Sequence, residues 1–150
     1  MDYSECRPVD ILIVDDDPMQ FDLMSEAFEE IDFPCRLSAV KDGEEALSYL
    51  RREGNYKSAE RPAMIFLDLN MPRKDGRAVL AEIKVDPELQ DIPVTVLSTS
   101  AAEEDVRAAY RLHANCYVQK PKNMAGLVDL AKTVQNFWFG QAALPSQHSH

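Results

Sequence analysis

Hydrophobic and polar positions follow two patterns along the chain, short apolar runs and longer segments with an apolar residue every three or four positions. The apolar runs predict five strands, over residues 10–14, 35–40, 63–68, 94–98 and 115–119. A helical pattern follows each run, and Pro18, Asp42 and Asn123 stand where three of the helices are expected to begin. Ser100 and Glu103 have the spacing of a capping box, which predicts that the fourth helix begins there.

Five strands that alternate with helices predict an α/β fold with a parallel sheet and helices on both of its faces. Because crossovers are right-handed, few topologies remain, and the flavodoxin-like doubly wound order 2-1-3-4-5 is expected at this length. The chain has 150 residues, which suits a single domain. We expect this domain over residues 1–140, followed by a flexible tail over residues 141–150.

The chain is acidic, with 16 basic and 26 acidic residues and a formal net charge of −10 at pH 7. Because binding to a phosphate backbone needs a basic face, nucleic acid is not an expected partner. No apolar stretch approaches the roughly 18 residues of a membrane span, so we expect no membrane association. The three cysteines form no CxxC motif and are interpreted as free thiols, which favours a cytoplasmic location.

Acidic residues follow two of the predicted strands. Asp15, Asp16 and Asp17 come directly after the first strand, and Asp68 ends the third. The ligand crevice of the predicted topology lies at the carboxyl ends of these same two strands. Clustered carboxylates repel one another unless a hard cation lies between them. The pattern therefore predicts a Mg²⁺-type site with one carboxylate free to react.

The fourth and fifth strands add a hydroxyl and an ammonium group at the same edge, from Ser98 and Lys120. These two groups can bind phosphate oxygens, while a cation offsets the negative charge of the phosphate. The free carboxylate can then attack phosphorus and become an aspartyl phosphate. The combination predicts transfer of a phosphoryl group onto a carboxylate.

Taken together, these motifs resemble the response-regulator receiver domain, the phosphoacceptor of two-component signalling. The resemblance covers roughly residues 9–138. Its motifs are Ile11-Leu12-Ile13-Val14-Asp15-Asp16, Leu67-Asp68-Leu69-Asn70-Met71-Pro72, Asp75-Gly76, Ser98-Thr99 and Tyr117-Val118-Gln119-Lys120-Pro121. It implies a signalling protein that promotes its own phosphotransfer and autodephosphorylation, rather than an enzyme.

The resemblance implies a role for each residue of the acidic edge. Asp68 is expected to carry the phosphate. Asp16 is expected to bind Mg²⁺ (or Mn²⁺) directly and Asp15 through water, with Asp68 and the backbone carbonyl of Asn70 as further ligands.

The resemblance also implies a switch. Ser98 is the expected switch hydroxyl, Tyr117 the aromatic switch residue, and Lys120 the partner of the phosphate. Phosphorylation would then alter the surface formed by the fourth helix, the fifth strand and the fifth helix. The family usually carries a cis bond before the matching proline, so Lys120-Pro121 is expected to be cis.

The expected partner is a sensor histidine kinase, and loop lengths resemble the small regulators paired with bacterial phytochrome kinases. Only residues 140–150 follow the last predicted helix, so we expect a single-domain regulator that acts by protein contacts or by relay to a downstream phosphotransfer protein. Three adjacent aromatic residues end that helix, and they cannot all face one core. With two tyrosines they predict a homodimer interface that consists of Tyr110, Tyr117, Phe137, Trp138 and Phe139.

Two alternatives remain open at this point. The first is an aspartate-nucleophile phosphatase of the haloacid dehalogenase type, since Asp15-Asp16-Asp17 contains a DxD motif. In that case Asp15, not Asp68, would carry the phosphate. The second is a degenerate receiver that takes no phosphate and acts only as an interaction module.

Overall fold

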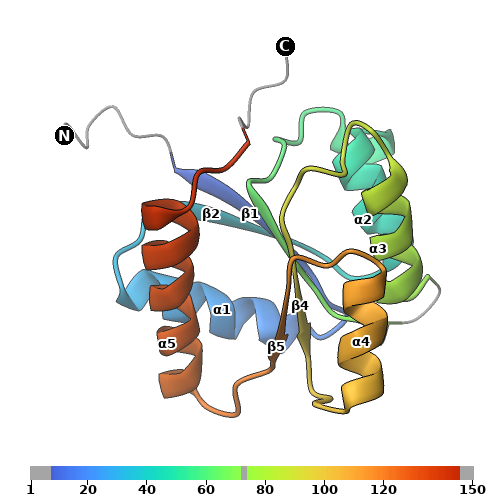
Figure 1. Ribbon diagram of the computed structural model, residues 1–150. Coiled ribbons are helices and arrows are strands. Elements are labelled where there is room, and N and C mark those ends of the chain that lie inside the picture. The colour runs from blue at the N-terminus through green and yellow to red at the C-terminus, as the bar shows by residue number, and fades with distance from the viewer. Residues whose placement is uncertain (1–7, 72–73, 146–150) are drawn as a thin grey trace.

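A computed structural model describes residues 8–71 and 74–145 of the chain, and its centre is a five-stranded parallel sheet (Figure 1). The strands are β1 (Val9–Val14), β2 (Cys35–Val40), β3 (Met64–Leu67), β4 (Val94–Ser98) and β5 (Cys116–Gln119). Their order is β2-β1-β3-β4-β5, which confirms the predicted flavodoxin-like topology.

Five α-helices cover the two faces of the sheet. They are α1 (Pro18–Glu30), α2 (Gly43–Arg51), α3 (Gly76–Val85), α4 (Glu103–Arg111) and α5 (Met124–Thr133). Figure 1 shows α1 and α5 on one face and α2, α3 and α4 on the other. A short 3₁₀ helix, η2 (Gly54–Tyr56), follows α2, and a π-helix, η3 (Val134–Gln141), continues α5. Among the described residues no helix is long and apolar enough to cross a membrane.

The sheet is buried on both faces because its central strands are apolar at most positions. Ile11 and Ile13 point into the core under α1 and α5, whereas Leu12 and Val14 point into the core under the other helices. Successive side chains of a strand point to opposite faces, so one continuous apolar run serves both cores. Because both faces of the sheet are covered by apolar cores, a site made of polar residues can form only at the ends of the strands.

Three predicted helix starts are confirmed by side-chain caps. Asp17 accepts a hydrogen bond from the Met19 N–H at 3.0 Å, and Asp42 and Asn123 cap α2 and α5 in the same way. The predicted capping box at residue 100 is wrong, because α4 begins at Glu103 with Ala102 as its cap residue. The Ser100 hydroxyl bonds to the Ala102 N–H and to Asp105 instead, so it is not available to a helix that begins at residue 101.

The C-terminal aromatic residues lie on the π-helix η3. Phe139 packs on Phe33 with ring centroids 5.5 Å apart, and Trp138 also contacts the core under α1 and α5. Phe137 meets Trp138 edge-on and is 48% exposed. The helical path extends to Gln141, and residues 146–150 of the predicted tail lie outside the described residues. The domain boundary after residue 140 stays a prediction.

Candidate functional site

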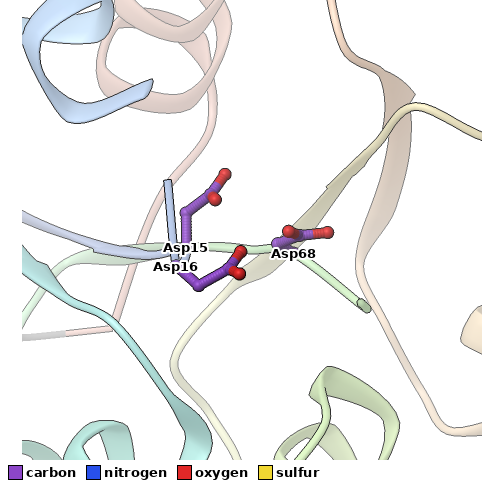
Figure 2. Close-up of side chains that lie close together, drawn as sticks. All are labelled: Asp15, Asp16 and Asp68. Carbon is purple, nitrogen blue, oxygen red and sulfur yellow. The ribbon is translucent and has the colours of Figure 1, made fainter. Parts of the chain in front are cut away.

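Three carboxylates meet at the carboxyl ends of β1 and β3. Asp15, Asp16 and Asp68 each offer an oxygen, and these three atoms lie within 4.8 Å of one another. Figure 2 shows the three side chains next to one another at the ends of their strands. Asp15 and Asp68 are buried and Asp16 is exposed. The predicted acidic cluster therefore forms, with one edge open to solvent.

The main chain orients the two buried carboxylates. The Asp17 N–H donates to Asp15 Oδ1 at 2.9 Å, and the Asn70 N–H donates to Asp68 Oδ1 at 3.1 Å. The other oxygen of each carboxylate, Oδ2, pairs with the ammonium group of Lys120. Lys120 Nζ lies 2.9 Å from Asp15 Oδ2 and 3.5 Å from Asp68 Oδ2.

Lys120 reaches this edge because β5 ends beside β4. Its N–H donates to the carbonyl of Ser98 at 2.7 Å, which continues the pairing of the two strands. Burial lowers the pKa of Lys120, but the hydrogen bond and charge of Asp15, with the charge of Asp68, more than reverse this, so the pKa lies above its usual value. The side chain is therefore a fixed positive charge at neutral pH.

Burial has the opposite consequence for Asp68. Loss of hydration raises the pKa of its carboxyl group, and the Asn70 N–H and the Lys120 ammonium only partly offset that rise. The positive charge of Lys120 thus only partly stabilises ionised Asp68. A further cation at this edge would favour the carboxylate form that can act as a nucleophile.

The donor set fits a hard divalent cation. Its side-chain oxygens all come from carboxylates, with no sulfur or imidazole among the grouped residues, and such cations bind oxygen ligands and keep part of their water shell. Asp16 is the exposed member and so faces the side from which a hydrated ion would arrive. The role predicted for the Asn70 carbonyl stays a prediction.

The predicted switch residues, Ser98 and Tyr117, meet through Ser100, for which the sequence pattern predicted only a capping role. Ser98 is completely buried, and its Oγ accepts a hydrogen bond from the Ser100 N–H at 3.2 Å. The Tyr117 hydroxyl donates to the Ser100 carbonyl at 2.9 Å. Ser98 itself was the available signal, because serine side chains often bond to the main chain two residues on.

The aromatic residues predicted for an interface fall into two groups. Tyr110 is 47% exposed, and its hydroxyl accepts a hydrogen bond from the Tyr117 N–H at 3.2 Å. Tyr117 packs on the core beneath α2, α3 and α4, whereas Trp138 and Phe139 pack on the core beneath α1 and α5. The two groups therefore lie on opposite faces of the sheet, with β5 at the edge between them.

The predicted cis bond at Lys120-Pro121 is wrong. No described peptide bond is cis, and these two residues lie within the described range. The trans form is the intrinsic preference of such bonds by about 0.5–1 kcal/mol. Lys120 contacts both Asp15 and Asp68 in this trans arrangement.

A sequence model described as "Response regulator receiver domain" matches residues 11–132. The chain belongs to the response regulator receiver domain family, and its role is that of a phosphoacceptor in two-component signalling. The family predicted from the sequence is thereby confirmed, and the phosphatase alternative is not favoured.

Three relatives place the chain within this family. It is 42% identical over 139 residues to the response regulator Rcp1 of Synechocystis sp., covering 93% of this chain and 95% of Rcp1. The crystal structure of the phosphorylated cyanobacterial phytochrome response regulator RcpA has a TM-score of 0.86 and 47% identity, covering 93% of this chain and 99% of RcpA. A probable methanogenesis regulatory protein of Methanothrix harundinacea, FilR2, is 40% identical over 89% of this chain and 85% of its own length.

Membership has two consequences for the site. A receiver domain receives its phosphoryl group from a histidine kinase or another phosphodonor, so the chain interacts with such a donor. Receiver domains also bind a divalent metal, and a Mn²⁺-bound crystal structure of Rcp1 has a TM-score of 0.83 to this chain. The acidic cluster of Asp15, Asp16 and Asp68 is the matching feature here.

Proposed function

We propose that Asp68 accepts a phosphoryl group from a sensor histidine kinase in a Mg²⁺-dependent reaction. The observation that carries this proposal is the arrangement around Asp68, a buried carboxylate 3.5 Å from the Lys120 ammonium and within 4.8 Å of two further carboxylates. When Mg²⁺ is bound, it supplies positive charge that offsets the negative charge of the phosphoryl oxygens. Asp15, Asp16, Asp68 and the Asn70 carbonyl are the proposed ligands.

The side chains around Asp68 divide the remaining work. An oxygen of Asp68 attacks phosphorus, so that a phosphorus–oxygen bond forms while the bond from phosphorus to the donor breaks. The Lys120 ammonium group binds one phosphoryl oxygen, and the Ser98 hydroxyl donates a hydrogen bond to another. Because the main chain holds one oxygen of Asp68, the attacking group is already oriented before the donor arrives.

We further propose that the kinase is of the phytochrome type. The resemblance to Rcp1, and to RcpA, a cyanobacterial phytochrome response regulator, supports this pairing. The similar identity to FilR2, whose name indicates a role in the regulation of methanogenesis, shows why the pairing needs its own test. Transfer of phosphate from a purified phytochrome kinase, and not from an unrelated kinase, is the observation that the pairing requires.

The proposal includes the rest of the signalling context. We propose that the protein acts as a phosphoacceptor that passes its signal through partner binding or a downstream phosphotransfer protein, rather than as a turnover enzyme. A reducing cytoplasm fits the free thiols of Cys35 and Cys116. The degenerate-receiver alternative would require the same residues to assemble without reacting.

The experiment that tests the proposal is intact mass measurement after incubation with acetyl phosphate and Mg²⁺. We expect wild type to gain the mass of one phosphoryl group, and we expect Asp68→Asn to gain none, because an amide is a poor nucleophile. Asp129→Asn on the exposed side of α5 is the matched control and should behave as wild type. An adduct that persists in Asp68→Asn and maps to Asp15 would support the phosphatase mechanism. No adduct in any variant, combined with no response to fluoroberyllate, would support a degenerate receiver.

We also propose a homodimer through the surface formed by α4, β5 and α5. Phe137, which is exposed on η3 directly after α5, supports the proposal because burying a large aromatic ring removes it from water and is favourable. Light scattering at tens of micromolar is expected to show a dimer for wild type and a monomer for Phe137→Glu. Val85→Glu is the control, since Val85 is also exposed but lies at the end of α3. A wild-type monomer with and without phosphate would rule the dimer out.

A further inference from the structure

Ser100 lies at a junction between β4 and α4 that is built from two successive serine turns. The Ser98 Oγ accepts from the Ser100 N–H at 3.2 Å, and the Ser100 Oγ accepts from the Ala102 N–H at 3.1 Å. The Ser100 carbonyl accepts from the Tyr117 hydroxyl at 2.9 Å. The main chain of Ser100 is therefore hydrogen-bonded to both Ser98 and Tyr117.

The side chain of Ser100 connects this junction to two helices. Its hydroxyl donates to Asp105 Oδ2 on α4 at 2.6 Å, and Asp105 Oδ1 accepts from Arg77 Nη2 on α3 at 3.2 Å. α3 and α4 lie on the same face of the sheet (Figure 1). Arg77 directly follows Gly76, which packs against the carbonyl of Asp68. We call Ser100, Asp105 and Arg77 the α3–α4 latch.

The two contacts of the latch differ in strength. The bond from Ser100 to Asp105 is short and has an ionised acceptor, and such bonds are about twice as strong as neutral ones. The Arg77–Asp105 pair has side chains that are 36% and 30% exposed, and exposed ion pairs contribute little. Arg77 therefore serves to orient Asp105, whereas the hydrogen bond from Ser100 is the stronger link between the β4–α4 junction and helix α4.

We propose that Ser100 is a positioning residue for the phosphoryl site, and that the latch holds Ser98 and Tyr117 in their observed places. This inference rests on the proposed function of Asp68. If the latch fixes the Ser100 main chain, it also fixes the hydroxyl of Ser98, whose proton is left to bond to a phosphoryl oxygen. Because Ser98 connects the Ser100 main chain to the phosphoryl site, we expect a change in the latch to alter the affinity of the site for a phosphoryl group.

The test is the affinity for fluoroberyllate in the presence of Mg²⁺, measured by calorimetric titration of the full chain. Ser100→Ala removes the hydroxyl and is expected to weaken binding about fivefold or more, the lower end of typical coupling between sites. Asp105→Asn is expected to weaken binding less, and Ser100→Thr to keep wild-type affinity because it retains a hydroxyl. Glu103→Gln is the control, since it breaks the Arg107–Glu103 pair on the same helix without touching the latch.

A second measurement separates failure of the latch from failure of the proposed function. With 3-fluorotyrosine incorporated, the Tyr117 signal in a ¹⁹F NMR spectrum, assigned with Tyr117→Phe, reports on the latch without any ligand. We expect this signal to shift in Ser100→Ala and Asp105→Asn and to stay in place in Glu103→Gln. If wild type does not bind fluoroberyllate, the proposed function fails and the Tyr117 signal alone decides on the latch. An unshifted signal in Ser100→Ala, or unchanged affinity where wild type binds, overturns the inference.

Discussion

Replacing Gly76 with alanine is expected to lower the free energy of unfolding by about 3 kcal/mol, near the upper end of overpacking costs. A Cβ atom at this position would lie 2.2 Å from the Asp68 carbonyl oxygen and 2.6 Å from the Leu69 Cα. Both neighbours are main-chain atoms at the end of β3, so they cannot turn aside as a side chain would. The start of α3 or the peptide that carries Asp68 must move.

This substitution should therefore affect function as well as stability. We expect the fraction of Gly76→Ala that is phosphorylated by acetyl phosphate to fall even at temperatures where the protein is folded, because Asp68 is displaced from Lys120. Urea unfolding and intact mass measure the two effects.

Gly54→Ala is the control for the effect of a methyl group alone. Gly54 has a φ of +59° and nothing within 4 Å of a Cβ, so we expect a cost of only about 1 kcal/mol from backbone strain. Gly54 also lies away from the site, in η2, so phosphorylation should be unchanged. A Gly76→Ala protein that is as stable as Gly54→Ala would show that the end of β3 is more compliant than the structure indicates.

Replacing Lys120 with methionine is expected to have the second largest effect, and the size of that effect should depend on metal. Without metal, three carboxylates within 4.8 Å lose the ammonium group that lies 2.9 Å from Asp15. Buried pairs that lose one partner are destabilised by about 3–5 kcal/mol, and we expect about 3 kcal/mol because Asp16 remains in contact with water.

Divalent metal should reduce the difference in stability between wild type and Lys120→Met. A cation bound by Asp15, Asp16 and Asp68 provides the positive charge that Lys120→Met lacks, so the variant should bind Mg²⁺ more tightly than wild type and gain more stability from it. Urea unfolding with EDTA and with Mg²⁺ measures the change.

Mg²⁺ should not restore phosphoryl uptake in Lys120→Met. The loss of one donor to a developing negative charge slows a reaction about 100-fold, and Mg²⁺ cannot occupy the same position as the missing ammonium. Lys122→Met is the control, since Lys122 is an exposed lysine two residues further on. A Lys120→Met protein with wild-type stability in EDTA would show that Lys120 does not balance the carboxylates.

Much of the site could be predicted because it follows from topology. Asp15, Asp68, Ser98 and Lys120 each stand at the carboxyl end of a strand, and the strand order brings those ends to one edge. The spacing of apolar runs was enough to place them, since a parallel sheet aligns its strand ends whatever the details of packing. The roles of these residues remain proposals that the experiments above test.

The predictions that proved wrong depended on local alternatives of similar energy. Ser100 could cap a helix or bond to Ala102 and Asp105, and both arrangements satisfy its hydroxyl. The bond before Pro121 could be cis or trans, and the two forms differ by only about 0.5–1 kcal/mol. In such cases the residues that lie nearby in space decide between the alternatives, and the sequence alone does not reveal which residues these are.

The amino-acid sequence by itself thus determined the order of the strands, the capped starts of α1, α2 and α5, and the meeting of the carboxylates with Lys120. The tertiary structure alone decided the latch between Arg77, Asp105 and Ser100, and the close approach of Gly76 to Asp68. The physical reason is the range of the interactions involved. Periodicity and caps act within one element of the chain, whereas these contacts join residues of separate elements, whose side chains meet only after the helices have packed on the sheet.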